Sequence, residues 1–187
     1  MSNKTQESSR KKIISIVVAC YNESANIQEL HRRVTAVMAQ LPEYDYELIF
    51  VDNASTDNSE ELFDQLIAQD HHVHLISMSR NFGNNQPSLL AGFRYAHGDC
   101  AISIDGDLQD DPELILSFIE RWEAGNEVVY AVRRKRQGSL LRRIGYKCFY
   151  RLFKWLSYLD IPLDAGDTCL IDRVVIDVIT NLPEKDL

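Results

Sequence analysis

The 187-residue sequence lacks any long apolar run, which is the first feature that narrows its class. No stretch approaches the roughly 18 to 20 apolar residues that span a bilayer, so the sequence predicts no transmembrane helix. Its 8 glycines and 5 prolines are too few for a collagen-like or low-complexity chain. The four cysteines form no Cys-x-x-Cys pair, which favours reduced thiols in a cytosolic protein. With 45% apolar and 26% charged residues, the composition is that of a globular domain.

Acidic residues are missing from one segment of an otherwise acidic chain. Residues 133–154 hold nine of the 20 lysines and arginines and no aspartate or glutamate. All 28 acidic residues therefore lie elsewhere, and the formal net charge is -8. Because the acidic remainder would repel a polyanion, this distribution argues against binding of nucleic acid. It predicts instead a protein that meets anions at one place.

The N-terminus is polar, and we expect residues 1–12 to form a mobile tail ahead of one domain over 13–187. Lys11-Lys12 and the apolar run that follows them also resemble a short signal peptide or a lipoprotein box. The run has only eight residues, Ile13 to Cys20, which is near the lower limit for a signal sequence. Its β-branched composition favours a buried strand.

Short β-branched runs alternate with stretches of helical periodicity along residues 13–132. The expected strands are 13–19, 46–51, 73–78, 100–104 and 127–132, and the expected helices are 24–40, 57–68, 87–96 and 112–122. This alternation predicts an α/β fold with a mostly parallel, Rossmann-like sheet and helices on both faces. A further amphipathic helix is expected over 139–159, inside a basic segment at 133–159.

Polar or charged residues follow each of the five expected strands. They are Tyr21-Asn22-Glu23, Asp52-Asn53-Ala54-Ser55, Arg80-Asn81, Asp105-Gly106-Asp107 and Arg133-Arg134. Ligands of open parallel sheets bind beyond the carboxyl ends of the strands. We therefore expect these five clusters to gather at one rim of the sheet and to form the functional site.

The segment Asp105–Asp111 is the most distinctive of these clusters, with four carboxylates and one carboxamide in seven residues. Neighbouring carboxylates repel one another unless a cation neutralises them, and their hard oxygen atoms suit Mg²⁺ or Mn²⁺. The alternative is a solvated acidic turn that caps the helix expected from Pro112. The position directly after an apolar strand favours the metal site.

Two further groups of polar residues each allow a structural and a functional interpretation. Asp52 closes the second expected strand, where a carboxylate can accept hydrogen bonds from a ribose or a nucleobase. Ser55, Thr56 or Asp57 can cap the next helix, and both roles can hold together. The histidines at 71, 72 and 74 straddle an expected helix end and strand start, which favours a loop over a metal site.

Four motifs occur in the order and spacing of family 2 glycosyltransferases. They are Ala-Cys-Tyr-Asn-Glu (19–23), Val-Asp-Asn-Ala-Ser-Thr-Asp (51–57), Ser-Arg-Asn-Phe-Gly (79–83) and Asp-Gly-Asp-Leu-Gln-Asp (105–110). The chain resembles this family over about residues 13 to 182. Arg-Asn-Phe-Gly, Asp-x-Asp-Leu-Gln and the later basic segment resemble its polyprenyl-phosphate branch. That branch includes dolichyl-phosphate mannosyltransferase and bacterial undecaprenyl-phosphate sugar transferases.

The resemblance implies a GT-A fold that binds a nucleoside-diphosphate sugar. Ala19, Tyr21, Glu23 and Asp52 would contact the base and ribose. The other residues expected in the donor site are Arg80, Asp105, Gly106, Asp107 and Arg133. The resemblance also implies a divalent metal, Mg²⁺ or Mn²⁺, bound on the diphosphate by Asp105, Asp107 and Gln109.

The reaction implied by the resemblance is inverting transfer of the sugar to a membrane-embedded polyprenyl phosphate, either undecaprenyl or dolichyl. Such an acceptor is already anionic, so it needs little help from a general base. The larger task is to stabilise the charge on the departing diphosphate, which a metal and arginines can do. Asp111 and Asp167 are the two candidate catalytic carboxylates, and neither is favoured. The residues expected on the acceptor phosphate are Arg134, Arg136, Ser139 and Arg142.

The basic segment at 133–159 combines aromatic and basic residues in the pattern of a helix that lies in a membrane interface. The alternative is an amphipathic helix packed on the core. We expect a peripheral protein on the cytoplasmic face of a membrane. The sequence leaves open whether the chain forms a homo-oligomer.

Three features depart from the family pattern. Asn84 stands where many relatives have lysine, and Thr168-Cys169 stands where relatives often have Phe-Arg. Relatives also continue past the equivalent of Leu187, so we expect a fragment, a natural truncation or a shorter variant. Two alternatives follow: a glycosyltransferase with a soluble saccharide or protein acceptor, and a non-catalytic nucleotide-sugar-binding module. A nucleotidyltransferase is disfavoured, because no glycine-rich phosphate loop follows the first expected strand.

Overall fold

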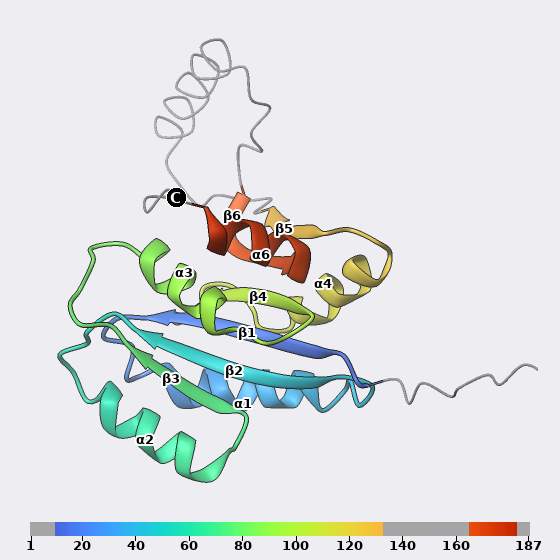
Figure 1. Cartoon of the computed structure of the whole chain (residues 1–187). Helices are drawn as coiled ribbons and strands as arrows, with labels where there is room; N and C mark the ends of the chain where they lie inside the picture. Colours follow the sequence, from blue (N-terminus) through green and yellow to red (C-terminus); the bar gives the residue numbers. More distant parts are fainter. Residues whose placement is uncertain (1–9, 133–164, 183–187) are drawn as a thin grey trace, which may run out of the picture.

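The computed structural model describes residues 10–132 and 165–182 (Figure 1). The strands are β1 (Ile13–Cys20), β2 (Asp45–Asp52), β3 (Val73–Ser77), β4 (Cys100–Asp105), β5 (Val128–Val132) and β6 (Ala165–Asp172). The helices are α1 (Ile27–Met38), α2 (Ser59–Gln69), α3 (Gln86–Tyr95), α4 (Leu114–Glu123) and α6 (Arg173–Asn181). Every strand and helix expected between residues 13 and 132 is therefore present, with small shifts at the ends. The helix expected over 139–159 lies outside the described residues.

The six strands form one mixed sheet in the order β3-β2-β1-β4-β6-β5. Strands β1, β2, β3 and β4 are parallel, whereas β6 is antiparallel to both of its neighbours. The pairing of β6 places it between β4 and β5, so β5 runs in the same direction as β4. The mostly parallel sheet is confirmed. The insertion of β6 is a feature that the strand–helix alternation did not predict.

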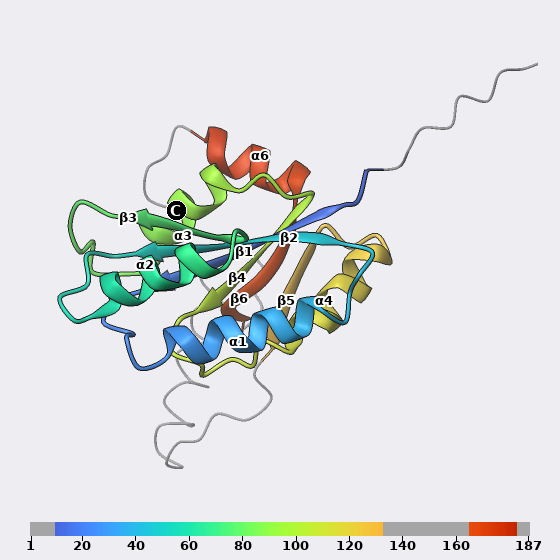
Figure 2. The same cartoon turned by 90° about the horizontal axis from the view of Figure 1, so that it is seen from below.

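Helices cover both faces of the sheet, as the alternation predicts (Figures 1 and 2). Helices α1, α2 and α4 pack on one face, where Leu30, Phe63 and Phe118 join the core against the side chains of β1, β2 and β4. Helices α3 and α6 pack on the other face, over a smaller core that contains Val17 and Ile176. The strands of the centre are buried on both sides, which explains their nearly continuous apolar sequence.

The described part of the chain begins against the body of the domain. Within residues 10–12, which we assigned to the tail on sequence grounds, Lys12 pairs with Glu123 at 2.7 Å and lies over the Trp122 ring. Arg10 pairs with Asp99 at 2.9 Å. Among the described residues, no helix combines the length and apolarity needed to cross a bilayer.

Gly92 sets how closely α3 approaches the sheet. A Cβ at this position would overlap the side chain of Val17 in β1 and would lie 3.2 Å from Val51 Cγ2 in β2. The helix can rest directly on these strands only because residue 92 carries no side chain. This contact fixes α3 above β1 and β2, and with it the loop that enters α3 near the ends of both strands.

Candidate active site

The carboxyl ends of β1, β2 and β4 lie side by side at one rim of the sheet. The register of the parallel strands pairs Cys20 with Asp52 and Ala19 with Asp105. Strand β5 ends at this rim as well, because it runs in the same direction as β4. The antiparallel β6 begins here. The rim therefore gathers the clusters that follow β1 to β4, as expected for an open α/β sheet, whereas Arg133-Arg134 lies outside the described residues.

Cys20 lies at the centre of this rim, and the pKa of its thiol reflects the negative charge gathered there. Its thiol is buried, and burial is the main reason why its pKa is raised well above the ordinary value. The carboxylates of Glu23, Asp52, Asp105 and Asp57 raise the pKa further, in that order. Four acidic groups from three loops therefore act on one point, and the resulting potential favours a bound cation.

The loop after β4 is held tightly against the end of β1. The Gly106 N–H donates to the Ala19 carbonyl at 3.2 Å. A Cβ on Gly106 would lie 3.0 Å from Cys20 Sγ and 3.2 Å from that carbonyl oxygen, so a larger residue would push the loop away. Leu108 then adopts a φ of 57°, a left-handed conformation that non-glycine residues seldom adopt. Such strain is often found at functional loops.

Two hydrogen bonds orient the aspartates of this loop. Asn85 Nδ2, from the residue before α3, donates to Asp105 Oδ1 at 3.1 Å. The Gln109 N–H donates to Asp107 Oδ1 at 3.0 Å, which closes a turn around the second aspartate. Asp105 and Asp107 are both partly exposed, and Gln109 is exposed. Their oxygen atoms suit a hard divalent cation such as Mg²⁺ or Mn²⁺, so the residues present fit the expected metal.

Asp52 is buried at the end of β2, where Ser55 satisfies it. The Ser55 hydroxyl donates to Asp52 Oδ1 at 2.5 Å, and the Ser55 N–H lies 3.1 Å from the same oxygen. Ser55 Oγ also accepts from the Asn22 N–H at 2.9 Å, so the same side chain ties the β1 loop to the β2 loop. Asn22 and Ala54 both have positive φ values, 56° and 59°.

Asp57 stabilises the entry to α2 rather than capping it from the N-cap position. It accepts from the Ser59 hydroxyl at 2.5 Å and from the Ser24 N–H at 3.1 Å. Burial alone would raise the pKa of Asp57, but these hydrogen bonds outweigh it and hold the pKa at about 2. The carboxylate therefore stays ionised. It links the start of α2 to the loop before α1.

Asn53 anchors the loop between β3 and α3. Its side chain is buried and accepts from the Phe82 N–H at 3.1 Å, while its amide lies 3.4 Å from Asn81 Oδ1. Arg80 is exposed at the start of this loop, with its guanidinium over the Phe82 ring at 4.3 Å. Asn84 Oδ1 accepts from the Gln86 N–H at 3.1 Å, so this side chain supports the start of α3.

The last two acids of the Asp105–Asp111 segment lie in different environments. Asp110 is buried and accepts a hydrogen bond from the Thr168 hydroxyl in β6 at 2.7 Å. Asp111 is exposed and pairs with Arg33 of α1 at 2.9 Å. Arg33 also pairs with Glu113, and this hydrogen bond is the main reason why the pKa of Glu113 is lowered. The end of the loop is therefore anchored both by α1 and by the strand β6.

The structure brings together the expected donor-site residues that it describes on β1, β2 and β4. They are Ala19, Tyr21, Glu23, Asp52, Asp105, Gly106 and Asp107. Arg133, Arg134, Arg136, Ser139 and Arg142 lie outside the described residues. Asp167 belongs to β6. Because β6 is antiparallel to β4 and Cys169 pairs with Ser103, Asp167 lies level with Asp105.

Several residues that support this site were not identified from the sequence. They are Arg33, Asn85 and Thr168, and each reaches the acidic loop through a hydrogen bond or an ion pair. Asn53 and Ser55 belong to a motif that the sequence did single out. Arg33 and Thr168 gave no local signal, because only the packing of α1 and β6 brings them to this loop.

The rim, its acidic loop and the layered sheet define a GT-A glycosyltransferase domain. Residues 15–179 match the family described as glycosyl transferase family 2, so the chain belongs to that family.

Curated relatives share the family over almost all of this chain. The chain is 46% identical over 173 residues to the "Uncharacterized glycosyltransferase YkcC" of Bacillus subtilis, covering 92% of this chain and 53% of that protein. It is 38% identical over 176 residues to the "Bactoprenol glucosyl transferase" of Shigella phage SfV, covering 93% of this chain and 56% of the relative. The chain thus spans about half the length of the curated relatives that it matches.

The fold is also found in solved structures. The "Mannosyltransferase PcManGT from Pyrobaculum calidifontis in complex with GDP-Man and Mn2+" superposes with a TM-score of 0.63 over 94% of this chain and 48% of its own. The two sequences are only 17% identical, so this likeness shows the shared fold.

Proposed function

We propose that this chain is the catalytic domain of a metal-dependent, inverting glycosyltransferase that moves a sugar from a nucleoside-diphosphate sugar to a polyprenyl phosphate. The observation that carries the proposal is the position of Asp105 and Asp107 at the rim beside Glu23 and Asp52. Acidic groups gathered at the carboxyl ends of parallel strands suit a cation and the anionic ligand that the cation attracts.

The donor nucleoside would lie across the ends of β1 and β2. Tyr21 is 41% exposed, and a base can stack against its ring. Asp52 is already held by Ser55, and its remaining lone pairs can accept hydrogen bonds from a ribose. Glu23 Oε2 accepts from Asn26 at 2.6 Å, which fixes that carboxylate at the edge of the same surface.

Asp105, Asp107 and Gln109 are the residues that would hold Mg²⁺ or Mn²⁺. When bound, the metal neutralises charge on the leaving diphosphate. Gly106 keeps the loop close to β1, and Asn85 orients the first aspartate. Pre-oriented ligands of this kind cost no rearrangement during the reaction.

The chemistry of a phosphate acceptor suits a site without an obvious base. A phosphate oxygen attacks the anomeric carbon while the bond to the diphosphate breaks, and a single displacement of this kind inverts the configuration. Asp111 already pairs with Arg33 at 2.9 Å. Its exposed position and this ion pair suit a structural role better than proton transfer.

The acceptor would approach from the basic segment at 133–159. We propose that Arg133 contacts the donor phosphate, and that the residues on the acceptor phosphate are Arg134, Arg136, Ser139 and Arg142. The segment would place the domain at the cytoplasmic face of a membrane as a peripheral protein. The name of the phage relative, a bactoprenol glucosyl transferase, supports this acceptor class.

Transfer of radiolabelled sugar from common nucleoside-diphosphate sugars to polyprenyl phosphate in detergent tests the proposal. We expect transfer that EDTA abolishes and that Mg²⁺ or Mn²⁺ restores. The Asp107→Asn variant should lose about 100-fold or more of this activity, the scale seen when one electrostatic contact of a transition state is lost. Asp64→Asn, an exposed aspartate on α2, is the matched control and should keep it.

Two outcomes would overturn the proposal. Turnover of a water-soluble saccharide or protein acceptor, without transfer to the lipid, would replace the acceptor class. Donor binding by calorimetry with no turnover of any acceptor, in the full protein, would identify a non-catalytic nucleotide-sugar-binding module instead.

A further inference from the structure

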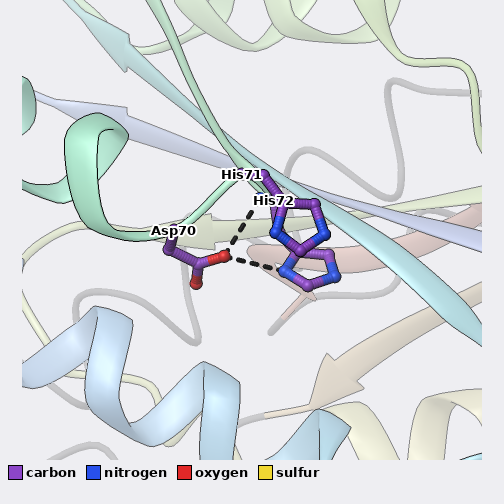
Figure 3. Close-up of side chains that lie close together, drawn as sticks. All are labelled: Asp70, His71 and His72. Carbon is purple, nitrogen blue, oxygen red and sulfur yellow. Dashed lines mark hydrogen bonds and ion pairs between the residues drawn. The ribbon is translucent and has the colours of Figure 1, made fainter.

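A second cluster of charged and imidazole groups lies at the opposite ends of the strands from the candidate active site, where β2 and β3 begin. We define the His–Asp cluster as His31 of α1 with Asp70, His71 and His72, which join α2 to β3. One ligand atom from each of Asp70, His71 and His72 lies within 4.8 Å of the others. Figure 3 shows the two imidazole rings one over the other, with the carboxylate beside them.

Asp70 is the junction of the His–Asp cluster. Its Oδ1 lies 2.7 Å from His72 Nδ1, and its Oδ2 lies 2.9 Å from His31 Nε2. Burial alone would raise the pKa of Asp70, but hydrogen bonds from the His72 backbone, His31 and the His72 side chain hold the pKa at about 2. The carboxylate is therefore ionised at neutral pH and is shared by residues from two elements.

The other groups around the cluster also fix its shape and add negative charge. The His72 ring stacks on Tyr46 with 4.2 Å between ring centroids, which limits how that imidazole can rotate. His72 Nε2 lies 3.8 Å from Asp45 Oδ1 at the start of β2. Asp70 itself is the C-cap of α2, and the negative end of a helix dipole favours a cation.

We propose that Asp70, His71 and His72 bind a divalent transition-metal ion of the zinc class. Two imidazoles and one carboxylate are a ligand set that suits Zn²⁺, Cu²⁺ or Ni²⁺, whereas Mg²⁺ and Ca²⁺ prefer oxygen ligands alone. Bonds of about 2.0 to 2.2 Å to each ligand would require the three side chains to shift slightly, and the exposed His71 leaves room for solvent ligands. The His31 imidazole acts as a positioning group, because it holds the second oxygen of the same carboxylate.

The proposed ion would hold the connection between α2 and β3, and α1 would contact it only through the His31–Asp70 hydrogen bond. It lies away from Asp105 and Asp107, which follow the other ends of the strands, so it is independent of the proposed transferase site. An ion that binds only the folded chain stabilises it. The site would therefore make the stability of this edge of the domain depend on the metal.

Titration of the full chain with ZnCl₂ alone, in buffer that holds excess Mg²⁺ to occupy hard oxygen sites, tests the proposal. Calorimetry should show one zinc-binding event, and zinc should raise the melting temperature. His72→Ala and Asp70→Asn should each weaken zinc binding at least about tenfold, and His31→Gln should weaken it by about tenfold through loss of positioning. His97→Gln removes a histidine whose side chain is 80% exposed in another loop, so it serves as the control and should bind zinc normally.

The absence of zinc binding by the wild-type chain would overturn the proposal. The cluster would then be a purely structural hydrogen-bond network that links α1 to the connection between α2 and β3. Zinc binding that survives both His72→Ala and Asp70→Asn would overturn it as well, because the ion would then bind elsewhere. Circular dichroism of each variant without metal separates lost ligands from lost folding. Sugar transfer does not enter these readouts, so the outcome is independent of the proposed function.

Discussion

The Thr168 hydroxyl donates a hydrogen bond to the Asp110 carboxylate at 2.7 Å, and both residues are buried. This bond joins β6 to the end of the acidic loop after β4, two segments that are far apart in the sequence. It also gives Thr168 an internal role, because this residue is only 2% exposed.

Replacing the Thr168 hydroxyl tests the value of this bond. Thr168→Val keeps the shape of the side chain but removes one donor from a buried carboxylate, so we expect a loss of about 1 to 3 kcal/mol in the free energy of unfolding. Thr168→Ser keeps the hydroxyl and should retain most of the stability. Urea unfolding of the three proteins measures the difference. Equal midpoints for the valine and serine variants would contradict a role for the bond.

Gly106 should be intolerant of even one added methyl group. Gly106→Ala would place a Cβ 3.0 Å from Cys20 Sγ and 3.2 Å from the Ala19 carbonyl oxygen, so the loop or these neighbours must yield by a few tenths of an ångström. We expect a stability loss of about 1 to 3 kcal/mol together with weaker metal-dependent donor binding. Gly125→Ala is the comparison, because Gly125 has a φ of +93° but no neighbour within 4 Å. Gly125→Ala should lower stability through backbone strain and leave donor binding unchanged. Calorimetry with nucleoside-diphosphate sugars measures donor binding, and an equal loss of binding in both variants would contradict the prediction.

Arg33 should contribute more to stability than its neighbour Arg32. Arg33 is only 20% exposed and pairs with both Asp111 and Glu113, so Arg33→Ala releases the start of α4 from α1. Arg32 is 66% exposed and pairs only locally with Glu29 on the same helix. Ion pairs near the surface contribute about 0 to 1 kcal/mol each, so we expect a loss of about 1 kcal/mol for Arg33→Ala and little change for Arg32→Ala. Chemical unfolding at low and high salt measures both, and a larger loss for Arg32→Ala would contradict the prediction.

Asp57 should make the stability of the domain depend on pH in the acid range. Its pKa is about 2 in the folded chain, below the value of about 3.9 expected when unfolded. The unfolded chain therefore binds more protons between these values, and the free energy of unfolding falls as the pH is lowered from about 4 to about 2. Asp57→Asn should be less stable than the wild type near neutral pH, and the two should converge near pH 2. Unfolding curves measured across this range test the sign, and a difference that grows toward low pH would refute it.

The local sequence determined much of the fold and most of the candidate donor site. The run from Ile13 to Cys20 is apolar on both faces, as a central parallel strand requires, and polar residues stand directly after it. The same pattern recurs at Asp52 and Asp105. Because parallel strands end at one rim, the position of these residues along the chain was enough to predict that they meet.

Tertiary structure alone decided the position of β6 and the anchors of the acidic loop. The segment Ala165–Asp172 includes Gly166 and Asp167, which disfavour a strand, so its strand conformation depends on pairing with β4 and β5. Arg33, Thr168 and His31 meet their acidic partners across long stretches of chain. Contacts of this kind leave no periodic signal in the sequence, because they depend on how separate elements pack rather than on the neighbours of each residue.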